Sequence, residues 1–390
     1  MKRLILCGGI VLIISLILVK FNSSKNNVCK TFGDYYTNRD QNENCYYNPD
    51  GELTTPEVIK RWGYPVETHT VLTEDGYILT LFRIHFGKKH SVKESKQPVL
   101  LQHGYKSNSK CFVAIGKKSL GFILADNGYD VWLGNFRGSI YSRNHSRIKD
   151  TDEEFWNFSF HEMGVYDTAA QIDYINKLTN KKLIYIGFSM GTTVGTIYAT
   201  TYPEISENKV KIFIHLAPFV FADGMVAPTR LLLNLWPYAA PIGQALTGGQ
   251  FYPEPYSDIN KAMWKFFCNP FPIQIFICTF IDLCMFGFDY EQADPETLTV
   301  AVLPLVDTVS IKTASHIAQF VILEKFQQFD YGRDGNLKKY GLIEPPLYDL
   351  SKVRVPMHLI RSDNDFVWNR EVLFLFTRES KAIRDLRSKA

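Results

Sequence analysis

The order of hydrophobic and polar residues predicts strands and helices that alternate along most of the chain. Residues 66–86 alternate apolar and polar positions around a Glu-Asp-Gly turn signal, which predicts two antiparallel strands. Short continuous apolar runs predict further strands, and helical spacing predicts helices at 119–129 and 167–179. The apolar runs lie at 98–104, 130–138 and 183–187; the sheet pattern continues to 211–218 and returns at 353–366. Strands that are apolar on both faces and alternate with helices favour an α/β fold with a mostly parallel sheet.

The alternation stops after residue 218, where a region rich in aromatic residues and proline begins. Its most apolar stretch, 263–288, is interrupted by Pro270, Pro272 and Asp282. A membrane-spanning helix needs about 20 uninterrupted apolar residues, so we predict a buried or lipid-facing helical cap instead. The last residues, 374–390, form a basic segment that we expect to be a helical tail.

The N-terminus has the pattern of a secretory signal. Three residues with two positive charges precede an apolar run from Leu4 to Val19, and a polar segment follows. We predict a signal peptide over 1–24; the alternative is an uncleaved membrane anchor, because the run is near the lower length limit for spanning a bilayer. The chain is therefore expected in a secreted or lysosomal location, or anchored in a membrane if the signal is not cleaved.

The amino-acid composition agrees with a secreted or lysosomal protein. The 390 residues are 46% hydrophobic, enough to bury the core of one large or two smaller domains. The net charge is only +3 and is scattered, which argues against a nucleic-acid partner. Outside Cys7, six cysteines remain, an even number whose pairing cannot be deduced from spacing. Asn144 and Asn157, like Asn22, begin glycosylation sequons.

The candidate chemistry lies at Gly187-Phe188-Ser189-Met190-Gly191, between a predicted strand and a helix-like pattern. A nucleophile elbow requires this arrangement, since a tight turn exposes the serine and the flanking glycines avoid a clash. The serine would begin a helix, whose N–H groups, including that of Met190, point at developing negative charge. The alternative is an ordinary strand-to-helix turn. A second donor of this kind should come from the loop that begins at "LQHGY" and contains Tyr105.

Seven sequence words, in the same order, resemble the acid lipase family of the α/β-hydrolases, which includes gastric and lysosomal acid lipases. The words are TTPEVIKRWGYPVETHTVLTEDGYIL (54–79), LQHGYKSNSKCFV (101–113), LADNGYDVWLGNFRGSIYSR (124–143), FWNFSFHEMGVYD (155–167), IGFSMGTT (186–193), KFQQFDYG (325–332) and PPLYDLSKVRVP (345–356).

The resemblance implies an α/β-hydrolase fold, in which helices flank a mostly parallel sheet and a helical cap with a lid is inserted after the sixth strand. The implied division is a first part of the hydrolase core at 25–218, the cap at 219–335 and a truncated last part of the core at 336–390. It also implies a cap disulfide, for which Cys268 and Cys278 are the best candidates. Cys284 would then be unpaired, and Cys29 with Cys45 is a possible second bridge.

The resemblance makes Ser189 the nucleophile, Asp365 the acid of the catalytic triad, and the backbone N–H groups of Tyr105 and Met190 the oxyanion hole. Asp363 is then a solvated neighbour. The family usually has histidine and glutamine beside the serine, where this chain has Phe188 and Met190. Methionine can still supply its backbone N–H, although packing near the acyl site should differ.

One departure concerns the catalytic base. The family's triad histidine follows the acid, but all nine histidines of this chain precede Asp365. His161 belongs to a structural family word, His103 would approach Ser189 from the wrong side, and His316 is expected in the core or against the lid. The chain is thus either a shortened form of an active enzyme or a relative that has lost its base. Loss of a triad member costs several orders of magnitude in rate and leaves binding intact.

These features predict a lipase that hydrolyses carboxylic esters of neutral lipids, triacylglycerol or sterol esters, through a serine acyl-enzyme. The aromatic cap suits a long acyl chain, and the expected partners are the lipid substrate and the lipid–water interface. We expect a monomer that uses neither metal nor cofactor. The competing prediction, based on the missing histidine, is a catalytically inactive lipase-like protein that binds lipid.

Overall fold

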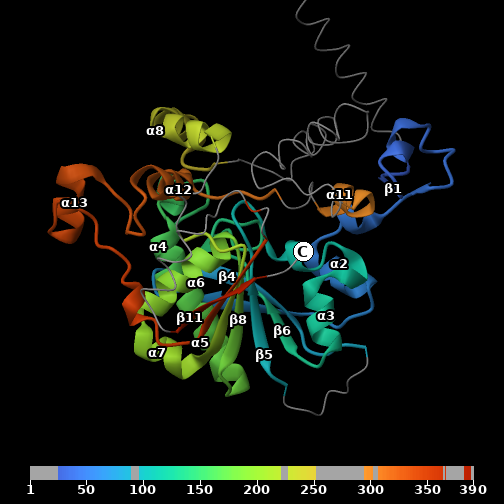
Figure 1. Ribbon diagram of the computed structural model, residues 1–390, viewed down its shortest axis with the longest axis horizontal. Coiled ribbons are helices and arrows are strands. Elements are labelled where there is room, and N and C mark those ends of the chain that lie inside the picture. Colours follow the sequence, from blue (N-terminus) through green and yellow to red (C-terminus); the bar gives the residue numbers. More distant parts are fainter. Residues whose placement is uncertain are drawn as a thin grey trace, which may run out of the picture.

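The computed structural model describes residues 25–88, 96–220, 227–251, 294–301, 306–362, 365 and 382–387. A nine-stranded sheet runs through the centre of the molecule (Figure 1). Its strand order is β11-β10-β9-β8-β5-β6-β4-β3, and the short strand β7 pairs with β4. The strands are β3 (Glu67–Leu72), β4 (Tyr77–Ile84), β5 (Pro98–Gln102), β6 (Asp130–Leu133), β7 (Asn144–His145), β8 (Leu183–Phe188), β9 (Val210–Leu216), β10 (Met357–Arg361) and β11 (Ile383–Arg387).

The pairing confirms the predicted mostly parallel sheet. Neighbouring strands from β11 through β10, β9, β8 and β5 to β6 are parallel. The hairpin expected in 66–86 forms β3 and β4, which pair antiparallel at the opposite edge. Because the parallel strands share one direction, the loops after β5, β8, β9 and β10 all emerge at the same edge of the sheet. This carboxyl edge is where the candidate site lies.

Helices cover both faces of the sheet (Figure 1). Helix α2 begins at a capping box, in which the Thr54 N–H and hydroxyl both donate to the Glu57 carboxylate at 2.8 and 2.6 Å. Helix α5 ends at Asn180, whose positive φ of 51° stops the helix. The helices of this part are α2 (Thr55–Arg61), α3 (Leu120–Asp126), α4 (Phe160–Glu162), α5 (Ala169–Thr179), α6 (Met190–Thr201) and α7 (Pro203–Lys209). Shorter turns are η1 (Gly33–Tyr36), η2 (Pro49–Gly51), η3 (Ser109–Phe112), η4 (Gly116–Lys118), η5 (Glu153–Trp156), η6 (Met163–Thr168) and η8 (Leu350–Lys352).

Two apolar clusters, one on each face, hold the helices on the sheet. Strand β5 contributes to both, since Leu100 belongs to the cluster that includes α5 and α6, whereas Val99 and Leu101 belong to the cluster that includes α2 and α3. All three side chains are buried. Alternate residues of a strand point to opposite faces, so a central strand between two helical layers must be apolar at every position. That requirement explains the continuous apolar run in the sequence.

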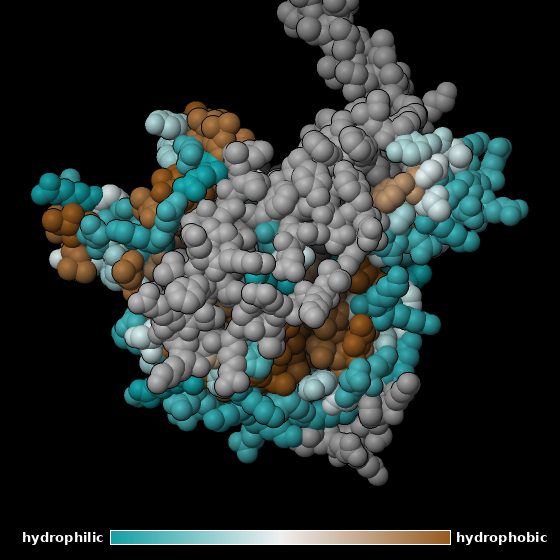
Figure 2. Space-filling model, in the orientation of Figure 1, coloured by the Kyte–Doolittle hydropathy of each residue, from teal (hydrophilic) through white to brown (hydrophobic). Residues whose placement is uncertain are grey.

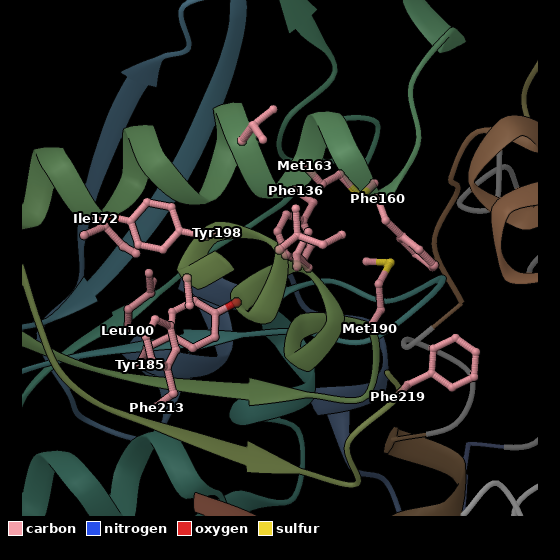
Figure 3. Close-up of a cluster of buried hydrophobic side chains, with 14 of the residues drawn as sticks. Leu100, Phe136, Phe160, Met163, Ile172, Tyr185, Met190, Tyr198, Phe213 and Phe219 are labelled. Atoms are coloured by element: carbon pink, nitrogen blue, oxygen red, sulfur yellow. The ribbon is translucent and has the colours of Figure 1, made fainter. Parts of the chain in front are cut away.

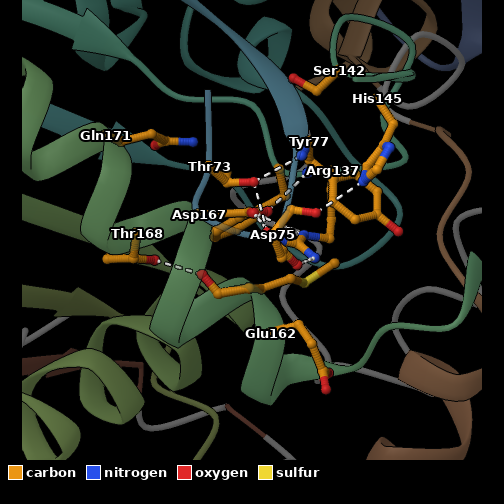
Figure 4. Close-up of polar contacts among 12 residues, drawn as sticks. Thr73, Asp75, Tyr77, Arg137, Ser142, His145, Glu162, Asp167, Thr168 and Gln171 are labelled. Atoms are coloured by element: carbon orange, nitrogen blue, oxygen red, sulfur yellow. Dashed lines mark hydrogen bonds and ion pairs between the residues drawn. The ribbon is translucent and has the colours of Figure 1, made fainter. Parts of the chain in front are cut away.

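A buried arginine joins the β3–β4 hairpin to the loop after β6 and to η6 (Figure 4). The Arg137 guanidinium contacts the carboxylates of Asp75 and Asp167, both at 2.6 Å, and lies over the ring of Tyr77. A charge buried without partners would be costly, and here two carboxylates and an aromatic face surround it. These contacts hold the loop after β6, which passes next to the predicted oxyanion residues.

The region after β9 contributes helices beyond the carboxyl edge of the sheet (Figure 1). They are α8 (Ala227–Thr247), α11 (Pro295–Ala301), α12 (Ile311–Leu323) and α13 (Gly332–Tyr340). Brown, apolar atoms lie over α8 in Figure 2, in agreement with its exposed leucines. None of the described helices combines the length and the apolar character that a membrane span needs. The predicted signal or anchor at 1–24 lies outside the described residues.

The N-terminal part forms a small separate hairpin of β1 (Val28–Cys29) and β2 (Cys45–Tyr46). A disulfide joins Cys29 and Cys45, which confirms the possible second bridge. The Tyr35 hydroxyl donates to the Pro295 carbonyl at 2.9 Å and so ties this hairpin to α11. The predicted cap bridge between Cys268 and Cys278, like Cys284, lies outside the described residues.

The prediction of a helical tail at 374–390 is wrong for the part of this segment that the structure describes. Residues Ile383–Arg387 form strand β11, which pairs in parallel with β10 in the register Met357 to Ile383. Without β11, one side of β10 would leave its backbone N–H and C=O groups unpaired. Pairing with β10 satisfies those groups, and this tertiary demand overrides the local helical pattern.

Candidate active site

Ser189 lies on the predicted turn between a strand and a helix, directly after β8 and at the N-cap of α6. Its φ of 50° and ψ of −115° place a non-glycine residue in a strained conformation. The Ser189 N–H donates to the Leu216 carbonyl of β9 at 2.9 Å, which closes the end of the strand pair. A sharp turn of this kind lifts the serine out of the sheet, as a nucleophile elbow requires.

The two flanking glycines are required by close backbone contacts. A Cβ on Gly187 would lie 2.6 Å from the carbonyl carbon and oxygen of Gly191. A Cβ on Gly191 would lie 2.4 Å from the Gln102 carbonyl oxygen at the end of β5. Real Cβ atoms do not approach backbone this closely, so any side chain at these positions would force α6 away from the sheet.

Thr192 fastens the turn to the chain that follows β9. Its hydroxyl donates to the Ser189 carbonyl at 2.6 Å and accepts from the Phe219 N–H at 2.8 Å. The next residue, Thr193, donates its hydroxyl to the Phe219 carbonyl. These bonds couple the geometry of the serine to Phe219, at the start of the predicted cap, a role that the sequence pattern alone did not reveal.

The loop after β5 packs directly on the serine turn. A Cβ on Gly104 would lie 3.3 Å from the Ser189 Cβ and 3.1 Å from the Phe188 ring, so this position has little spare room. Tyr105, the predicted second oxyanion donor, follows immediately, and Lys106 then adopts a left-handed φ of 52°. Met190 is the first residue of α6, where an N–H has no acceptor within its own helix. The structure thus packs the loop that carries Tyr105 against the turn at Ser189, and Met190 directly follows the serine.

Asp365 follows β10, so it lies at the same carboxyl edge as Ser189. Its N–H donates to the Ser362 carbonyl at 3.3 Å, and β9 lies between its strand and β8. This order of strands puts a candidate acid on the side of Ser189 opposite to the Tyr105 loop. Asp363 lies outside the described residues.

His103 is next to the oxyanion loop, but its ring nitrogens are both used by the backbone. Nδ1 donates to the Gly104 carbonyl at 2.9 Å, and Nε2 accepts from the Phe136 N–H at 3.1 Å. Burial lowers the pKa of His103 to about 4. A general base needs a free lone pair directed at the serine, and this imidazole has none.

The other histidines that the sequence raised lie within packed layers. The His316 Nε2–H donates to the Gln327 carbonyl at 3.0 Å, and the ring stacks on Phe160. His161 contacts the Tyr348 hydroxyl at 3.0 Å. Among the described residues no hydrogen bond joins a histidine to Ser189, and within the same residues no group of three or more His, Cys, Asp or Glu could hold a metal ion.

Phe188 and Met190, the two residues that differ from the family pattern beside the serine, have different surroundings. Met190 is buried and lies beside Phe160, Met163 and Phe219 (Figure 3), so its side chain packs into the core and its N–H remains at the helix start. Phe188, by contrast, is 42% exposed and lies over Gly104. Methionine in place of a polar residue therefore enlarges the apolar core, whereas phenylalanine forms an apolar wall next to the serine turn.

A groove of about 340 Å³ lies between α8 and α12. Trp236, Ile311 and Phe329 are among its lining residues, but Ser189 and Tyr105 are not. The groove belongs to the region after β9 rather than to the catalytic edge. Of the candidate glycosylation residues, Asn144 and Asn157 are both exposed, and the Lys312 ammonium donates to the Asn157 side chain at 2.9 Å.

Fold and site together define an α/β-hydrolase. A family model described as "alpha/beta hydrolase fold" matches residues 97–252, and one described as "Partial alpha/beta-hydrolase lipase region" matches 55–116. Gastric triacylglycerol lipase of Bos taurus is 35% identical over 86% of this chain and 84% of its own. Lysosomal acid lipase/cholesteryl ester hydrolase of Macaca fascicularis is 35% identical over 82% of this chain and 80% of its own. The chain belongs to the family of gastric and lysosomal acid lipases.

Among solved structures, an esterase from Exiguobacterium antarcticum matches with a TM-score of 0.46 and 15% identity. The match covers 82% of this chain and 90% of that chain. A similarity at this level adds nothing to the family assignment, which rests on the sequence relatives.

Proposed function

We propose that this chain is a lipase that hydrolyses carboxylic esters of neutral lipids, triacylglycerol or sterol esters, through an acyl-enzyme on Ser189. The single observation that carries the proposal is the strained turn at Ser189, with φ of 50°, held by glycines that no other residue can replace. Strain of this kind persists only where the surrounding structure enforces it, and it is common at catalytic nucleophiles. The names of the relatives, which include triacylglycerol and cholesteryl esters, support the substrate class.

In the proposed reaction, the Ser189 Oγ attacks the ester carbonyl carbon and loses its proton. The carbonyl oxygen becomes an oxyanion, which the Tyr105 and Met190 N–H groups stabilise, and the alcohol leaves with a proton. Water then attacks the acyl-enzyme, releases the fatty acid and restores the serine hydroxyl. Asp365 is the proposed acid of the triad, whose usual role is to orient and stabilise the protonated base.

We further propose that 219–335 is the cap over this site, within the division 25–218, 219–335 and 336–390. The described helices α8, α11 and α12 lie within the proposed cap, and α13 runs across its last boundary at 335. The signal-like N-terminus, the disulfide and the exposed sequons at Asn144 and Asn157 support a secreted or lysosomal glycoprotein. We propose a monomer without cofactor.

A second candidate function is lipid binding without turnover. The observation that favours it is the position of the histidines, all of which precede Asp365 in the sequence. In this case the serine turn and the cap would still bind an ester, but no imidazole would take the serine proton.

Hydrolysis of a medium-chain p-nitrophenyl ester by the full chain and by Ser189→Ala distinguishes the two. Release of nitrophenolate by the native chain alone supports the lipase and means that another group acts as base. If both proteins stay at background and still bind a fluorescent long-chain ether analogue of the ester equally well, lipid binding is the function. Contaminating esterases would appear equally in both preparations.

A further inference from the structure

Asp307 is a buried carboxylate at which donors from the Tyr105 loop, from the loop after β6 and from its own chain neighbour converge. It lies just before α12 and has no exposed surface. Its Oδ2 accepts from the Asn108 side-chain amide at 2.8 Å, and its Oδ1 accepts from the Thr308 N–H at 2.7 Å. The Ile140 N–H lies 3.1 Å from both oxygens. In the other direction, the Asp307 N–H donates to the Lys106 carbonyl at 2.7 Å.

Two of these bonds hold the loop that carries Tyr105. Lys106 directly follows Tyr105 and is in the left-handed region, with φ of 52°. A non-glycine residue in that region costs free energy and keeps its conformation only when outside contacts hold it. The bond from the Asp307 N–H to the Lys106 carbonyl is such a contact, and the bond to Asn108 holds the loop two residues further on.

The orientation of the Asn108 amide is fixed from the other end. Its Oδ1 accepts from the Lys110 N–H at 2.9 Å and so caps η3, which leaves its Nδ2 to face Asp307. If the Asn108 side-chain amide were rotated by half a turn, its NH₂ group would face the Lys110 N–H, and two donors would oppose each other. Asp307 must therefore present an acceptor to Asn108 and a second acceptor to the backbone N–H groups of Thr308 and Ile140.

We propose that Asp307 is a positioning residue of the oxyanion hole, which holds the loop from Lys106 to Asn108 and thereby directs the Tyr105 N–H at the oxygen of the scissile carbonyl. The inference rests on the proposed function of Ser189 and adds a residue that does not touch the substrate. Only a carboxylate offers acceptors on both of its terminal atoms, which is what three donors require. Because the donors are buried, an unsatisfied one carries a large penalty.

This pattern allows a paired substitution. In Asp307→Asn, one atom of the new amide is a donor, so it opposes either the Asn108 amide or the backbone N–H groups. Adding Asn108→Asp reverses the polarity of that bond. The new amide at position 307 then donates to a carboxylate at position 108 and still accepts from the backbone of Thr308 and Ile140, while the carboxylate at position 108 accepts from the Lys110 N–H. The double variant thus restores the bonds to position 108, to Lys110 and to Thr308 with nearly the same atoms, and the Ile140 N–H keeps one of its two acceptors.

The experiment compares the native full chain, Asp307→Asn, the double variant Asn108→Asp/Asp307→Asn, Thr308→Val and Ser189→Ala. Thr308→Val is the matched control, because the Thr308 hydroxyl is buried, has no partner among the described residues and is next to Asp307. The probe is the p-nitrophenyl ester of a long-chain alkylphosphonate. In that reaction a bond forms between the Ser189 Oγ and phosphorus, nitrophenolate leaves and the serine proton goes to solvent, so no deacylation is needed.

The first measurement is the phosphonylation rate at saturating probe, together with the probe concentration that gives half of that rate. The second is the hydrogen exchange of the backbone amides of residues 104–110. For Asp307→Asn we expect a rate about 10- to 100-fold lower at an unchanged half-saturating concentration, because donors move away from the developing oxyanion while probe binding is unaffected. Exchange in 104–110 should rise at least about tenfold. The double variant and Thr308→Val should both stay within about threefold of the native chain.

A native rate and native exchange in Asp307→Asn would overturn the proposal, and so would a double variant no better than Asp307→Asn. If Asp307→Asn does not fold, the proposal still requires that the double variant folds and that its Ser189 reacts with the phosphonate. If the native chain reacts no faster than Ser189→Ala, the proposed function of Ser189 fails. Exchange of 104–110 then decides separately whether Asp307 holds the loop.

Discussion

Gly191 shows how single-residue contacts shape the nucleophile turn. A Cβ at this position would lie 2.4 Å from the Gln102 carbonyl oxygen, which is backbone and cannot rotate away. We expect Gly191→Ala to lower the free energy of unfolding by about 3 kcal/mol and to displace Ser189 from the Tyr105 loop. Chemical denaturation followed by tryptophan fluorescence, with the phosphonylation rate of Ser189, checks both effects.

The matched control is Gly33→Ala. Gly33 has no positive φ, and its nearest neighbour would be the Thr31 hydroxyl at 3.7 Å, an ordinary contact. This substitution should change the free energy of unfolding by less than about 0.5 kcal/mol. Equal stability of the two variants would mean that α6 has room to move away from β5 without cost, and the argument for an enforced turn would be lost.

Among the elements, the N-terminal hairpin depends most on one covalent bond. Cys29 and Cys45 are 16 residues apart, and closing a loop of that length is worth about 3 kcal/mol in the chain-entropy description. We expect Cys29→Ser/Cys45→Ser to open the hairpin locally and to release α11 by breaking the bond from Tyr35 to Pro295. Limited proteolysis should then cut within 25–48, whereas the melting of the central sheet changes little.

In this test the native chain with and without reductant serves as the control. Reduced native chain should show the same new cleavage as the double serine variant. Cleavage that stays absent in both would mean that packing alone holds β1 and β2, and the disulfide would then have no structural role under these conditions.

The elements that could be predicted from the sequence are those defined by local patterns. Continuous apolar runs gave β5 and β8, because a central strand between two helical layers is apolar on both faces. The Gly-x-Ser-x-Gly word gave the turn at Ser189, since its glycines respond to contacts only a few residues away.

Features that depend on distant partners could not be predicted in this way. Strand β11 exists because β10 has an open edge, which no pattern within 383–387 records. Asp307 is 199 residues from its partner Asn108, and its neighbours in sequence carry no motif. The engagement of both His103 nitrogens likewise needs the backbone of Phe136, from another strand's loop.

At the scale of the whole molecule, α8 presents an apolar face to solvent at the end of the molecule that carries the proposed cap. Five of its exposed side chains recur at helical spacing on one side of the helix, and Arg230 is the single charged residue of the helix. They are Leu231, Leu235, Tyr238, Ile242 and Leu246. A face of this kind suits adsorption to a lipid surface, since each apolar side chain transferred from water is worth about 1.5–3 kcal/mol.

We therefore expect Leu235→Asp/Tyr238→Asp to reduce binding to triolein emulsion droplets at least about tenfold. The control is Leu178→Asp, which alters an equally exposed leucine at the end of α5. Sedimentation of the droplets with bound protein gives the affinity. Reduced binding by the control and by the α8 variant alike would indicate a general effect of charge rather than a docking face.

Buried titratable groups predict how the stability of the whole chain depends on pH. Burial lowers the pKa of His103 and His316 to about 4 and that of His215 to about 3. Burial also raises the pKa of Asp307 to about 6. In the unfolded chain histidine titrates near 6.5 and aspartate near 3.9. Between pH 6 and pH 4, unfolding thus binds three protons at the histidines and releases one from Asp307.

Two protons are therefore taken up on unfolding, so these groups make the free energy of unfolding fall by about 2.7 kcal/mol for each pH unit between 6 and 4. His215→Phe removes one histidine whose nitrogens have no partner among the described residues, and the slope from these groups should fall to about 1.4 kcal/mol per pH unit. Asp307→Asn should have the opposite effect and raise the slope to about 4.1 kcal/mol per pH unit. Urea unfolding at half-unit steps of pH measures both. Repacking around a new side chain shifts the whole curve of unfolding free energy against pH, whereas loss of a titrating group changes its slope. Parallel curves for the native chain and the two variants would therefore disprove this assignment of protons.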